Sequence, residues 1–266
     1  MAPAGAHIRL PNEAPCAPTI TRAFDTLKLS LGGSYSRENF YQATTGHTSL
    51  SRDVRGGNTT IAGGYTFSLN QPQLHPTLEV RNQYAQNAFG SVTHTLTKLT
   101  IAQVGYELAR ITGYQDNPYL RARVNGTLVL GKVPDTRTRQ TFSARLRQAL
   151  PGETYLEADY RHYQDDWQVR SNAFSAGMSH HLSAALLVGG TYRRSAQTGA
   201  FFYRPEYTGG VPAFYTADFR LEPFAADLVT GKLTLSPRRS ALWLPDRKST
   251  RLNSSHVSES RMPSSA

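Results

Sequence analysis

The sequence has little cysteine and no long apolar run. Its 266 residues include one cysteine, Cys16, which excludes an intramolecular disulfide and a cysteine-rich metal site. No stretch approaches the ~18 apolar residues that a membrane-spanning helix needs, and the mean hydropathy of -0.45 lies on the polar side. If the chain crosses a membrane, it must therefore cross as strands of a closed barrel, because lipid offers no partner to backbone amides.

Motifs for catalysis and nucleotide binding are also missing. The sequence contains no Gly-x-Ser-x-Gly elbow, no phosphate-binding glycine loop and no dinucleotide fingerprint. We expect no enzymatic activity, no catalytic residue, no cofactor and no bound metal. The histidines His162, His180 and His181 are too irregularly spaced for a zinc site.

The acidic pair Asp165 and Asp166, followed by Trp167, has two readings. Paired carboxylates suit acid/base chemistry or a cation. A tight Asp-rich turn next to an interfacial Trp needs no such activity. The turn is the interpretation that we favour.

The formal net charge of +10 suits a nucleic acid or an anionic lipid as partner. Arginine is spread along the chain, however, and no nucleic-acid-binding motif is present. We expect no nucleic-acid partner. Binding to nucleic acid is the weakest hypothesis, and it predicts an affinity that falls steeply with salt.

The two ends of the chain differ in composition from the body. Residues 1–25 are predicted to be a disordered leader without the apolar core of a signal peptide. Residues 238–266 are predicted to be non-native or disordered, because the chain from Arg247 onward is rich in Ser, lacks periodicity and resembles translated sequencing-adapter sequence. The incomplete β-barrel domain is expected to span 26–237.

Between these ends, apolar and polar residues alternate in segment after segment, which is typical of β-strands. Several segments reach the ~9–11 residues with which a tilted strand crosses a bilayer. The eleven candidate strands are 27–37, 44–54, 58–69, 78–95, 99–110, 137–149, 154–164, 168–181, 185–195, 213–222 and 227–236.

The connections alternate in length, as they do in outer-membrane barrels. Long connections are predicted at 70–77, 111–136 and 196–212. Turn signals that fall between them are Gly56-Gly57, Thr97-Lys98, Pro151-Gly152, His181-Leu182-Ser183 and Pro223-Phe224. The short turn at Asp165-Asp166-Trp167 is the exception, because it falls on the side of the long loops.

Two neighbouring candidate strands separate apolar from charged side chains. The apolar faces hold Phe142, Ala144, Leu146, Leu156, Ala158 and Tyr160, and the candidate lumen-lining residues on the other faces are Arg145, Arg147, Glu157, Asp159 and Arg161. We expect the apolar faces to contact lipid, because Arg or Lys at the midplane costs roughly 2–4 kcal/mol. Alternation is equally compatible with a soluble sandwich whose faces are inverted.

Arginines recur along one strand face and admit two interpretations. Arg137, Arg139, Arg145 and Arg147 alternate, and Arg161 and Arg170 lie on the next segments. They form either a cationic ladder that favours anions in a pore or structural pairs with Glu157 and Asp159, which a hairpin through Pro151-Gly152 would bring close. Both interpretations stay open.

Several segments resemble the bacterial domain-of-unknown-function family 3570. They include VGYELARITGYQDNPYLRARVNG (104–126), PDTRTRQTFSARLRQAL (134–150), YRHYQDDWQVRSNAFSAGM (160–178) and ADFRLEPFAADLVTGKL (217–233). The resemblance implies an outer-membrane β-barrel without an established activity. It also implies an exported protein that ends on a membrane strand with a terminal aromatic residue, which the barrel-assembly machinery reads, and this sequence shows neither feature.

The sequence thus predicts an all-β, antiparallel, up-and-down transmembrane β-barrel that is truncated, with about eleven strands present and at least one missing. Its expected place is the bacterial outer membrane, as a pore or a structural or assembly element. The expected partners are outer-membrane lipid and the barrel-assembly machinery, and the solute is unknown.

The alternative is a soluble β-rich module that binds carbohydrate or protein through aromatic loops. Its candidate loop contacts are Tyr114, Tyr119, Trp167 and Tyr203, together with Phe201, Phe202 and Tyr207. This alternative predicts solubility without detergent.

Overall fold

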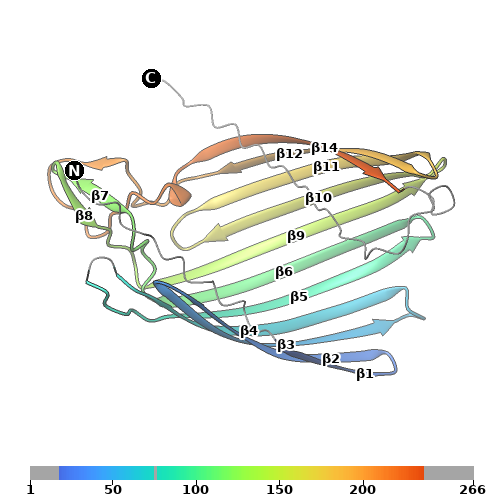
Figure 1. Cartoon of the computed structure of the whole chain (residues 1–266), viewed down its shortest axis with the longest axis horizontal. Coiled ribbons are helices and arrows are strands. Elements are labelled where there is room, and N and C mark those ends of the chain that lie inside the picture. Colours follow the sequence, from blue (N-terminus) through green and yellow to red (C-terminus); the bar gives the residue numbers. More distant parts are fainter. Residues whose placement is uncertain (1–17, 75–76, 237–266) are drawn as a thin grey trace, which may run out of the picture.

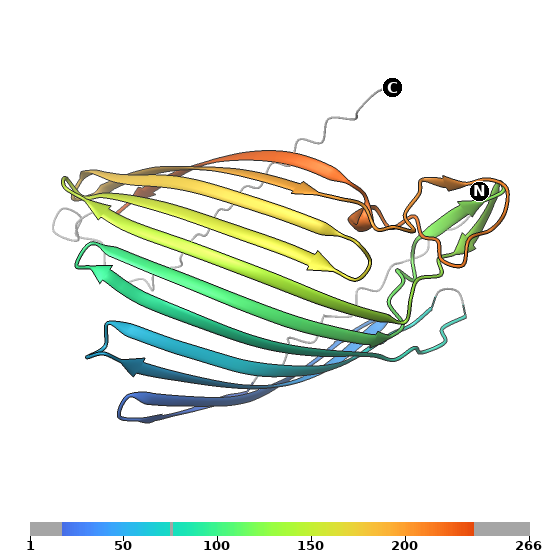
Figure 2. The ribbon, with the colours of Figure 1, turned by 180° about the vertical axis from the view of Figure 1, so that it is seen from behind.

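A computed structural model describes residues 18–74 and 77–236, and these residues form one large curved sheet and one small sheet (Figures 1 and 2). The large sheet is antiparallel, with eleven strands in the order β1-β2-β3-β4-β5-β6-β9-β10-β11-β12-β14. Its strands are β1 (Thr19–Phe24), β2 (Leu27–Glu38), β3 (Tyr41–Val54), β4 (Thr59–Pro72), β5 (Gln83–Thr97), β6 (Thr100–Gly113), β9 (Thr136–Leu150), β10 (Thr154–Asp165), β11 (Arg170–Ser183), β12 (Leu186–Gln197) and β14 (Phe224–Leu235).

The sheet is a barrel wall that is open along one side. Its outermost strands, β1 and β14, each have one neighbour within the described residues, so the wall is not closed there. Most of its strands have 12 to 15 residues. That length exceeds the ~5–6 residues common in soluble sheets and is sufficient for a tilted strand to cross a bilayer. Within the described ranges, no helix is long and apolar enough to span a membrane.

The connections at the two ends of the wall differ in length, as the sequence predicts. Tight turns join β1 to β2, β3 to β4, β5 to β6, β9 to β10 and β11 to β12, and they lie at one end, on the right in Figure 1. The three long connections, 73–82, 114–135 and 198–223, lie at the other end. The short turn after Asp165 is also on the long-loop side, as predicted, and the two-residue turn Asn39-Phe40 between β2 and β3 is a second exception that was not predicted.

One sequence-based strand assignment is wrong and one strand was missed, so the total of eleven strands in the large sheet still agrees. Residues 213–222 are not a strand, because the Asp218 side chain accepts a hydrogen bond from the backbone N–H of Arg220 and caps the short 3-10 helix η1 (Phe219–Leu221). Consequently no hairpin turn lies at Pro223-Phe224. Conversely, Thr19–Phe24, assigned to the leader, is β1 and pairs with β2. The rest of the leader, 1–17, and the predicted tail, 238–266, lie outside the described residues.

The turn between β11 and β12 is displaced from its predicted position. β11 continues through His181 to Ser183, and the turn residues are Ala184 and Ala185. A register shift between His181 and Ser183 accommodates the difference. The turns at Gly56-Gly57, Pro151-Gly152 and Thr97-Lys98 lie where they are predicted, within one residue.

The two faces of the wall have opposite character. On β9 to β12 the apolar side chains that are about 40–60% exposed lie mostly at even-numbered positions, including Phe142, Leu146, Phe174 and Met178. The odd-numbered positions face the hollow, since Arg139, Tyr163, Ser171 and Ser195 line one cavity there. No second layer of the described residues covers the apolar side chains on the convex face.

Most of the buried apolar residues lie at the long-loop end, in a structure that we call the loop cap (residues 114–135, 166–169 and 198–223). It contains the small sheet of β7 (Arg121–Val124), β8 (Thr127–Leu130) and β13 (Glu206–Tyr207). One cluster consists of Val133, Trp167, Val169, Ala200, Phe202 and Leu221, and a second of Ala122, Val124 and Tyr207. The cap thus has the hydrophobic core that the wall lacks.

The hairpin of β7 and β8 shows why the cap is more ordered than a plain loop. Its turn is Asn125-Gly126, where both residues have positive φ values of 48° and 80°. This is the pair that two-residue hairpin turns favour. The sequence therefore contained a signal for structure within the predicted loop 111–136.

Candidate functional site

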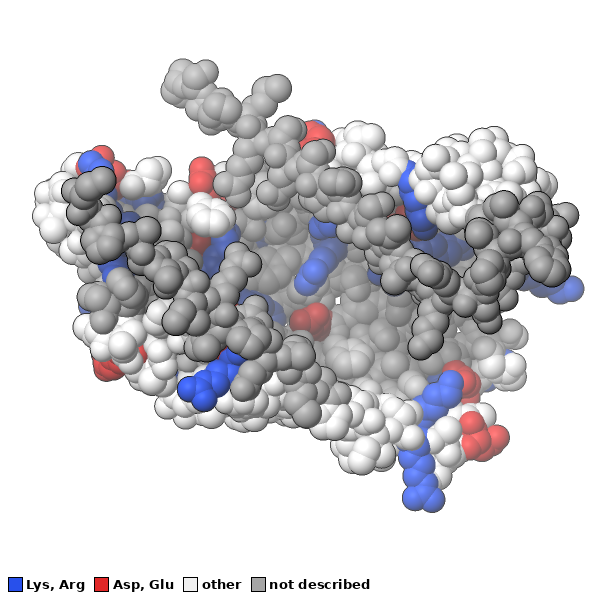
Figure 3. All heavy atoms as spheres, viewed as in Figure 1, with Lys and Arg blue, Asp and Glu red and all other residues white. Residues whose placement is uncertain are grey.

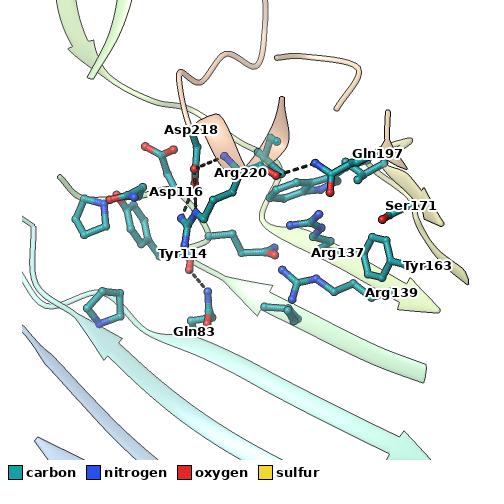
Figure 4. Close-up of a pocket in the computed structure, with 18 of the residues that line it drawn as sticks. Gln83, Tyr114, Asp116, Arg137, Arg139, Tyr163, Ser171, Gln197, Asp218 and Arg220 are labelled. Atoms are coloured by element: carbon teal, nitrogen blue, oxygen red, sulfur yellow. Dashed lines mark hydrogen bonds and ion pairs between the residues drawn. The ribbon is translucent and has the colours of Figure 1, made fainter. Parts of the chain in front are cut away.

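A cavity of about 850 Å³ lies at the long-loop end, between the concave face of the wall and the loop cap. We call it the basin. Its charged lining residues are Arg137, Arg139, Arg161, Arg193, Arg220, Glu38, Asp116 and Asp218. Figure 4 shows the arginines from β9 beside Tyr163, with Arg220 and Asp218 of the cap above them. Figure 3 looks toward the hollow of the wall, where basic side chains lie deep inside.

Arg137 is a structural member of the basin. Its Nε donates to Asp165 Oδ2 at 2.8 Å, and its guanidinium carbon lies 4.2 Å from the centroid of the Trp167 ring. The Asp165 side chain is 0% exposed, and Tyr163 donates its hydroxyl to the same Oδ2 at 2.7 Å. Because a buried carboxylate needs paired charge and hydrogen bonds, Arg137 compensates Asp165 and has little capacity left for a ligand.

The turn from Asp165 to Trp167 is fixed by backbone contacts. Asp165 Oδ1 accepts from the Val169 N–H at 2.9 Å, and Asp166 Oδ2 accepts from the Thr138 N–H at 2.9 Å. The indole N–H of Trp167 donates to the Thr136 carbonyl at 3.0 Å. Both carboxylates therefore hold the turn against β9, as the favoured interpretation predicts, but Trp167 is buried in the core of the cap and is not an interfacial residue.

Three other arginines of the basin have no acidic partner among the described residues. Arg139, Arg161 and Arg193 take part in none of the ion pairs found there. The Nε atom of Arg139 is buried without a hydrogen-bond partner, and Arg161 and Arg193 are exposed toward the cavity. These unpaired guanidinium groups give the basin an excess of positive charge.

Small side chains separate two of these arginines. Arg161 of β10 pairs with Ala173 of β11, and Arg193 of β12 pairs with Ser175 of β11. Two strand spacings of roughly 4.8 Å each, together with an offset of two residues along the strands, place the two backbone positions about 12 Å apart. Ala173 lines the cavity between Arg161 of β10 and Ser195 of β12, so no large side chain fills the floor of the basin at that position.

The other predicted lumen residues form a balanced cluster nearer the tight turns. Arg145 Nε lies 2.7 Å from Asp159 Oδ1, and Arg147 lies 3.1 Å from Asp159 and 3.6 Å from Glu157. The β9–β10 register sets Arg147 opposite Glu157 and Arg145 opposite Asp159. The predicted pairing across Pro151-Gly152 is present, and two arginines face two acids.

The structure divides the predicted arginine ladder into three groups. Arg137, Arg145 and Arg147 are paired with acids, while Arg139 and Arg161 are not. Arg170 does not belong to the ladder, because it occupies an even-numbered position of β11 and neighbouring Ser171 lines the basin. Arg193 belongs to the basin and was missed, since its strand shows no alternation of charge around it.

Most aromatic loop residues are used by the cap itself. Trp167 is 2% and Phe202 is 5% exposed, and their rings meet edge to face at 5.1 Å. Tyr203 packs against this cluster, and Tyr114 is half-buried, whereas Tyr119 is 57% exposed. Their rings do not form an open stacking platform, which the alternative of a carbohydrate-binding module would need.

Tyr207 joins the parts of the cap and was identified from the sequence only as a loop aromatic. Its ring is 3% exposed. Its hydroxyl accepts from the backbone N–H groups of Arg204 at 3.0 Å and Thr216 at 2.9 Å, and lies 2.6 Å from the Phe202 carbonyl, to which it donates. One hydroxyl therefore satisfies three backbone groups that the loop would leave unpaired.

Asp116 couples two segments of the cap at the rim of the basin. Thr216 Oγ1 donates to its Oδ1 at 3.2 Å, while its Oδ2 is buried without a partner among the described groups. Burial raises the pKa of Asp116 to about 6, and nearby Asp218 adds to this rise against the opposing hydrogen bonds from Asn117 and Thr216. Burial and the Asp116 charge together raise the pKa of adjacent Tyr114 to about 12.

Solved structures share the fold of the wall. The loop-deletion mutant of OmpT, an outer membrane protein of Vibrio cholerae, aligns with a TM-score of 0.53 and 10% identity over 82% of this chain and 62% of that one. An anion-selective porin from Comamonas acidovorans aligns with a TM-score of 0.54 and 8% identity over 82% of this chain and 58% of that one. The fold is thus that of an outer-membrane β-barrel protein, and the chain spans about three-fifths of the length of these structures.

The comparison with sequence families gives a more specific result than the comparison of folds. A family model described as a protein of unknown function (DUF3570) matches residues 79–238, which is more than half of the chain. The chain belongs to this family, as the motifs predict. A search of curated protein sequences found no match.

Proposed function

We propose that this chain forms part of an outer-membrane barrel that conducts small solutes and favours anions. The observation that carries the proposal is the set of three arginines, Arg139, Arg161 and Arg193, that face the basin without an acidic partner among the described residues. Rings of basic side chains are a known basis for anion preference in pores. The likeness to an anion-selective porin from Comamonas acidovorans agrees with this choice.

The proposed location rests on the convex face of the wall. Exposed apolar side chains such as Val104, Leu146 and Met178 would destabilise a protein in water but suit contact with lipid. Outer-membrane lipid is therefore the proposed partner, and the barrel-assembly machinery is proposed to insert the chain. The candidate residues Arg145, Arg147, Glu157, Asp159 and Arg161 would then line the lumen, with the first four supplying a neutral stretch below the basin.

The test of the proposed function is a measurement of ion preference. The protein, expressed from its complete gene, is reconstituted in planar bilayers under a potassium chloride gradient. We expect a reversal potential that indicates anion preference, and a marked loss of this preference when Arg139, Arg161 and Arg193 are all replaced by Gln. Arg110→Gln is the matched control, because it removes one charge from an even-numbered position of β6 beside cavity-lining Ile111. Folded protein that conducts nothing, or a triple variant with unchanged preference, would contradict the proposal.

A further inference from the structure

We propose that the basin holds a specific binding site for a small organic solute with two separate acidic groups, such as a short dicarboxylate. The proposal rests on the proposed function, because it names the class of solute that the hollow would conduct. Arg161 and Arg193 are the residues to which we assign the two acidic groups, and Arg139 borders the same site.

The arrangement of charge favours two anionic groups over one. Arg161 and Arg193 project from β10 and β12, which lie on opposite sides of β11. To bind one compact anion, both guanidinium groups would have to contact the same few atoms. The strand register instead places Arg161 and Arg193 two residues apart along the strands. Each guanidinium can bind one carboxylate through two parallel hydrogen bonds. A solute with acidic groups at its two ends satisfies both.

The shape of the floor leaves room for the connecting carbon chain. Ala173 of β11 lies between Arg161 of β10 and Ser195 of β12 and lines the cavity, and Ser171, two residues earlier on the same face of β11, also lines it. Their side chains are short, and the hydroxyl groups offer further donors to a carboxylate. A larger side chain at Ala173 would fill the cavity beside Arg161.

Two acidic residues near the basin are paired with other cations, which leaves Arg161 and Arg193 available to bind a solute. The acids nearest to the other basin cations already have partners, since Asp165 accepts from Arg137, and Asp218 accepts from Arg220. Glu38 lies on β2, on the opposite part of the wall. A solute that binds Arg161 and Arg193 therefore displaces no ion pair among the described residues.

Trp167 provides a direct readout of occupancy. It lines the basin, and the chain has one other tryptophan, Trp243. In a Trp243→Phe background, the fluorescence of the refolded protein in detergent is titrated with succinate, with propionate as the monoacid and with inorganic phosphate as the compact dianion. We expect saturable binding of succinate, weaker binding of phosphate and none of propionate.

The variants assign the site. Arg161→Gln and Arg193→Gln are each expected to weaken succinate binding about tenfold or more, because each removes a charge-assisted pair of hydrogen bonds. Arg110→Gln changes the net charge equally and is expected to leave binding unchanged. Ala173→Leu tests the floor, and it should abolish binding while the protein keeps its heat-dependent gel migration.

The outcomes separate this proposal from the proposed function. Anion-preferring conductance without saturable succinate binding overturns the site and leaves the pore intact. Saturable binding that Arg161→Gln weakens, in a folded protein that conducts nothing, supports the site and overturns the pore. Tighter binding of phosphate than of succinate, or equal losses in Arg110→Gln and Arg161→Gln, overturns the assignment of two separate acidic groups.

Discussion

The barrel wall and the loop cap of this chain bury their apolar residues in different ways. In the cap, Trp167, Phe202 and Tyr207 pack inward and are at most 5% exposed. In the wall, residues such as Val92, Leu146 and Met178 point outward and are 39%, 43% and 56% exposed. The cap therefore follows the rule of soluble proteins, while the wall can bury its apolar face only against lipid. Each substitution below tests whether the two regions obey these different rules.

The largest expected effect is on the core of the cap. Trp167→Ala removes a buried ring that packs on Phe202 and lies against the Arg137 guanidinium. A buried Trp→Ala change typically costs about 3–5 kcal/mol. We expect limited proteolysis to cut the variant rapidly within the cap, while heat-dependent gel migration of the wall persists. Tyr119→Ala, at an exposed position, is the control and should remain resistant. Loss of both properties together would show that cap and wall are one cooperative unit.

The next effect is on the lipid face of the wall. Val92→Arg places a charge on the convex face of β5, where it costs roughly 2–4 kcal/mol near the bilayer midplane. Ser91→Arg introduces the same charge one residue earlier, on the concave face. Ser91 points to the same side of the wall as Gly105 of β6, because a Cβ added at Gly105 would lie 3.6 Å from the Ser91 Cβ. We expect poor membrane insertion for Val92→Arg and near-normal insertion for Ser91→Arg, measured by outer-membrane fractionation. The reverse order would mean that the faces of the wall have been assigned wrongly.

A smaller effect is expected from one hydroxyl group in the cap. Tyr207→Phe keeps the ring but leaves the backbone groups of Phe202, Arg204 and Thr216 without their partner. Buried groups left unpaired cost about 1–3 kcal/mol. The expected result is intermediate protease sensitivity in the segment 198–223, below that of Trp167→Ala. Tyr119→Phe serves as the matched control. Equal protease sensitivity of the two Phe variants would show that the Tyr207 hydroxyl does not stabilise the cap.

The smallest effect concerns pH and the rim of the basin. Because the pKa of Asp116 is raised to about 6 from the usual 3.8, the folded cap binds a proton more readily than the unfolded chain. This group therefore favours the folded cap at low pH, and the cap is expected to loosen as pH rises through about 6. Proteolysis rates measured at about pH 5 and about pH 7.5 should differ for the natural chain and converge for Asp116→Asn. If Asp116→Asn keeps the full pH dependence, a group other than Asp116 causes it.

The sequence predicted the wall better than the cap, for a physical reason. Strand alternation and the turn at Pro151-Gly152 are local signals, and they fix the register that brings Arg145 to Asp159 and Arg147 to Glu157. β1 was missed because its six residues follow a Pro/Ala-rich stretch that reads as a leader. Residues 213–222 alternate like a strand, but the capping carboxylate of Asp218 and the contacts of Thr216 determine their conformation.

The basin could be predicted only in part. Arg137 and Arg139 look equivalent in the sequence, yet one is paired with Asp165 and the other is not. That difference depends on the β10–β11 turn and on Trp167, which lie about thirty residues further along the chain. The opposition of Arg161 and Arg193 across β11 depends on the register of three strands. Residue types alone do not reveal which charges remain without a partner.

The central claim is that the convex face of the wall is buried in lipid, and gel migration of the protein expressed from its complete gene tests it most directly. The account predicts that the protein fractionates with outer membranes and that its migration changes on boiling, as expected of a closed, detergent-resistant barrel. A product that is soluble without detergent and migrates identically before and after boiling would contradict it, because the exposed apolar face would then have to be buried within the protein.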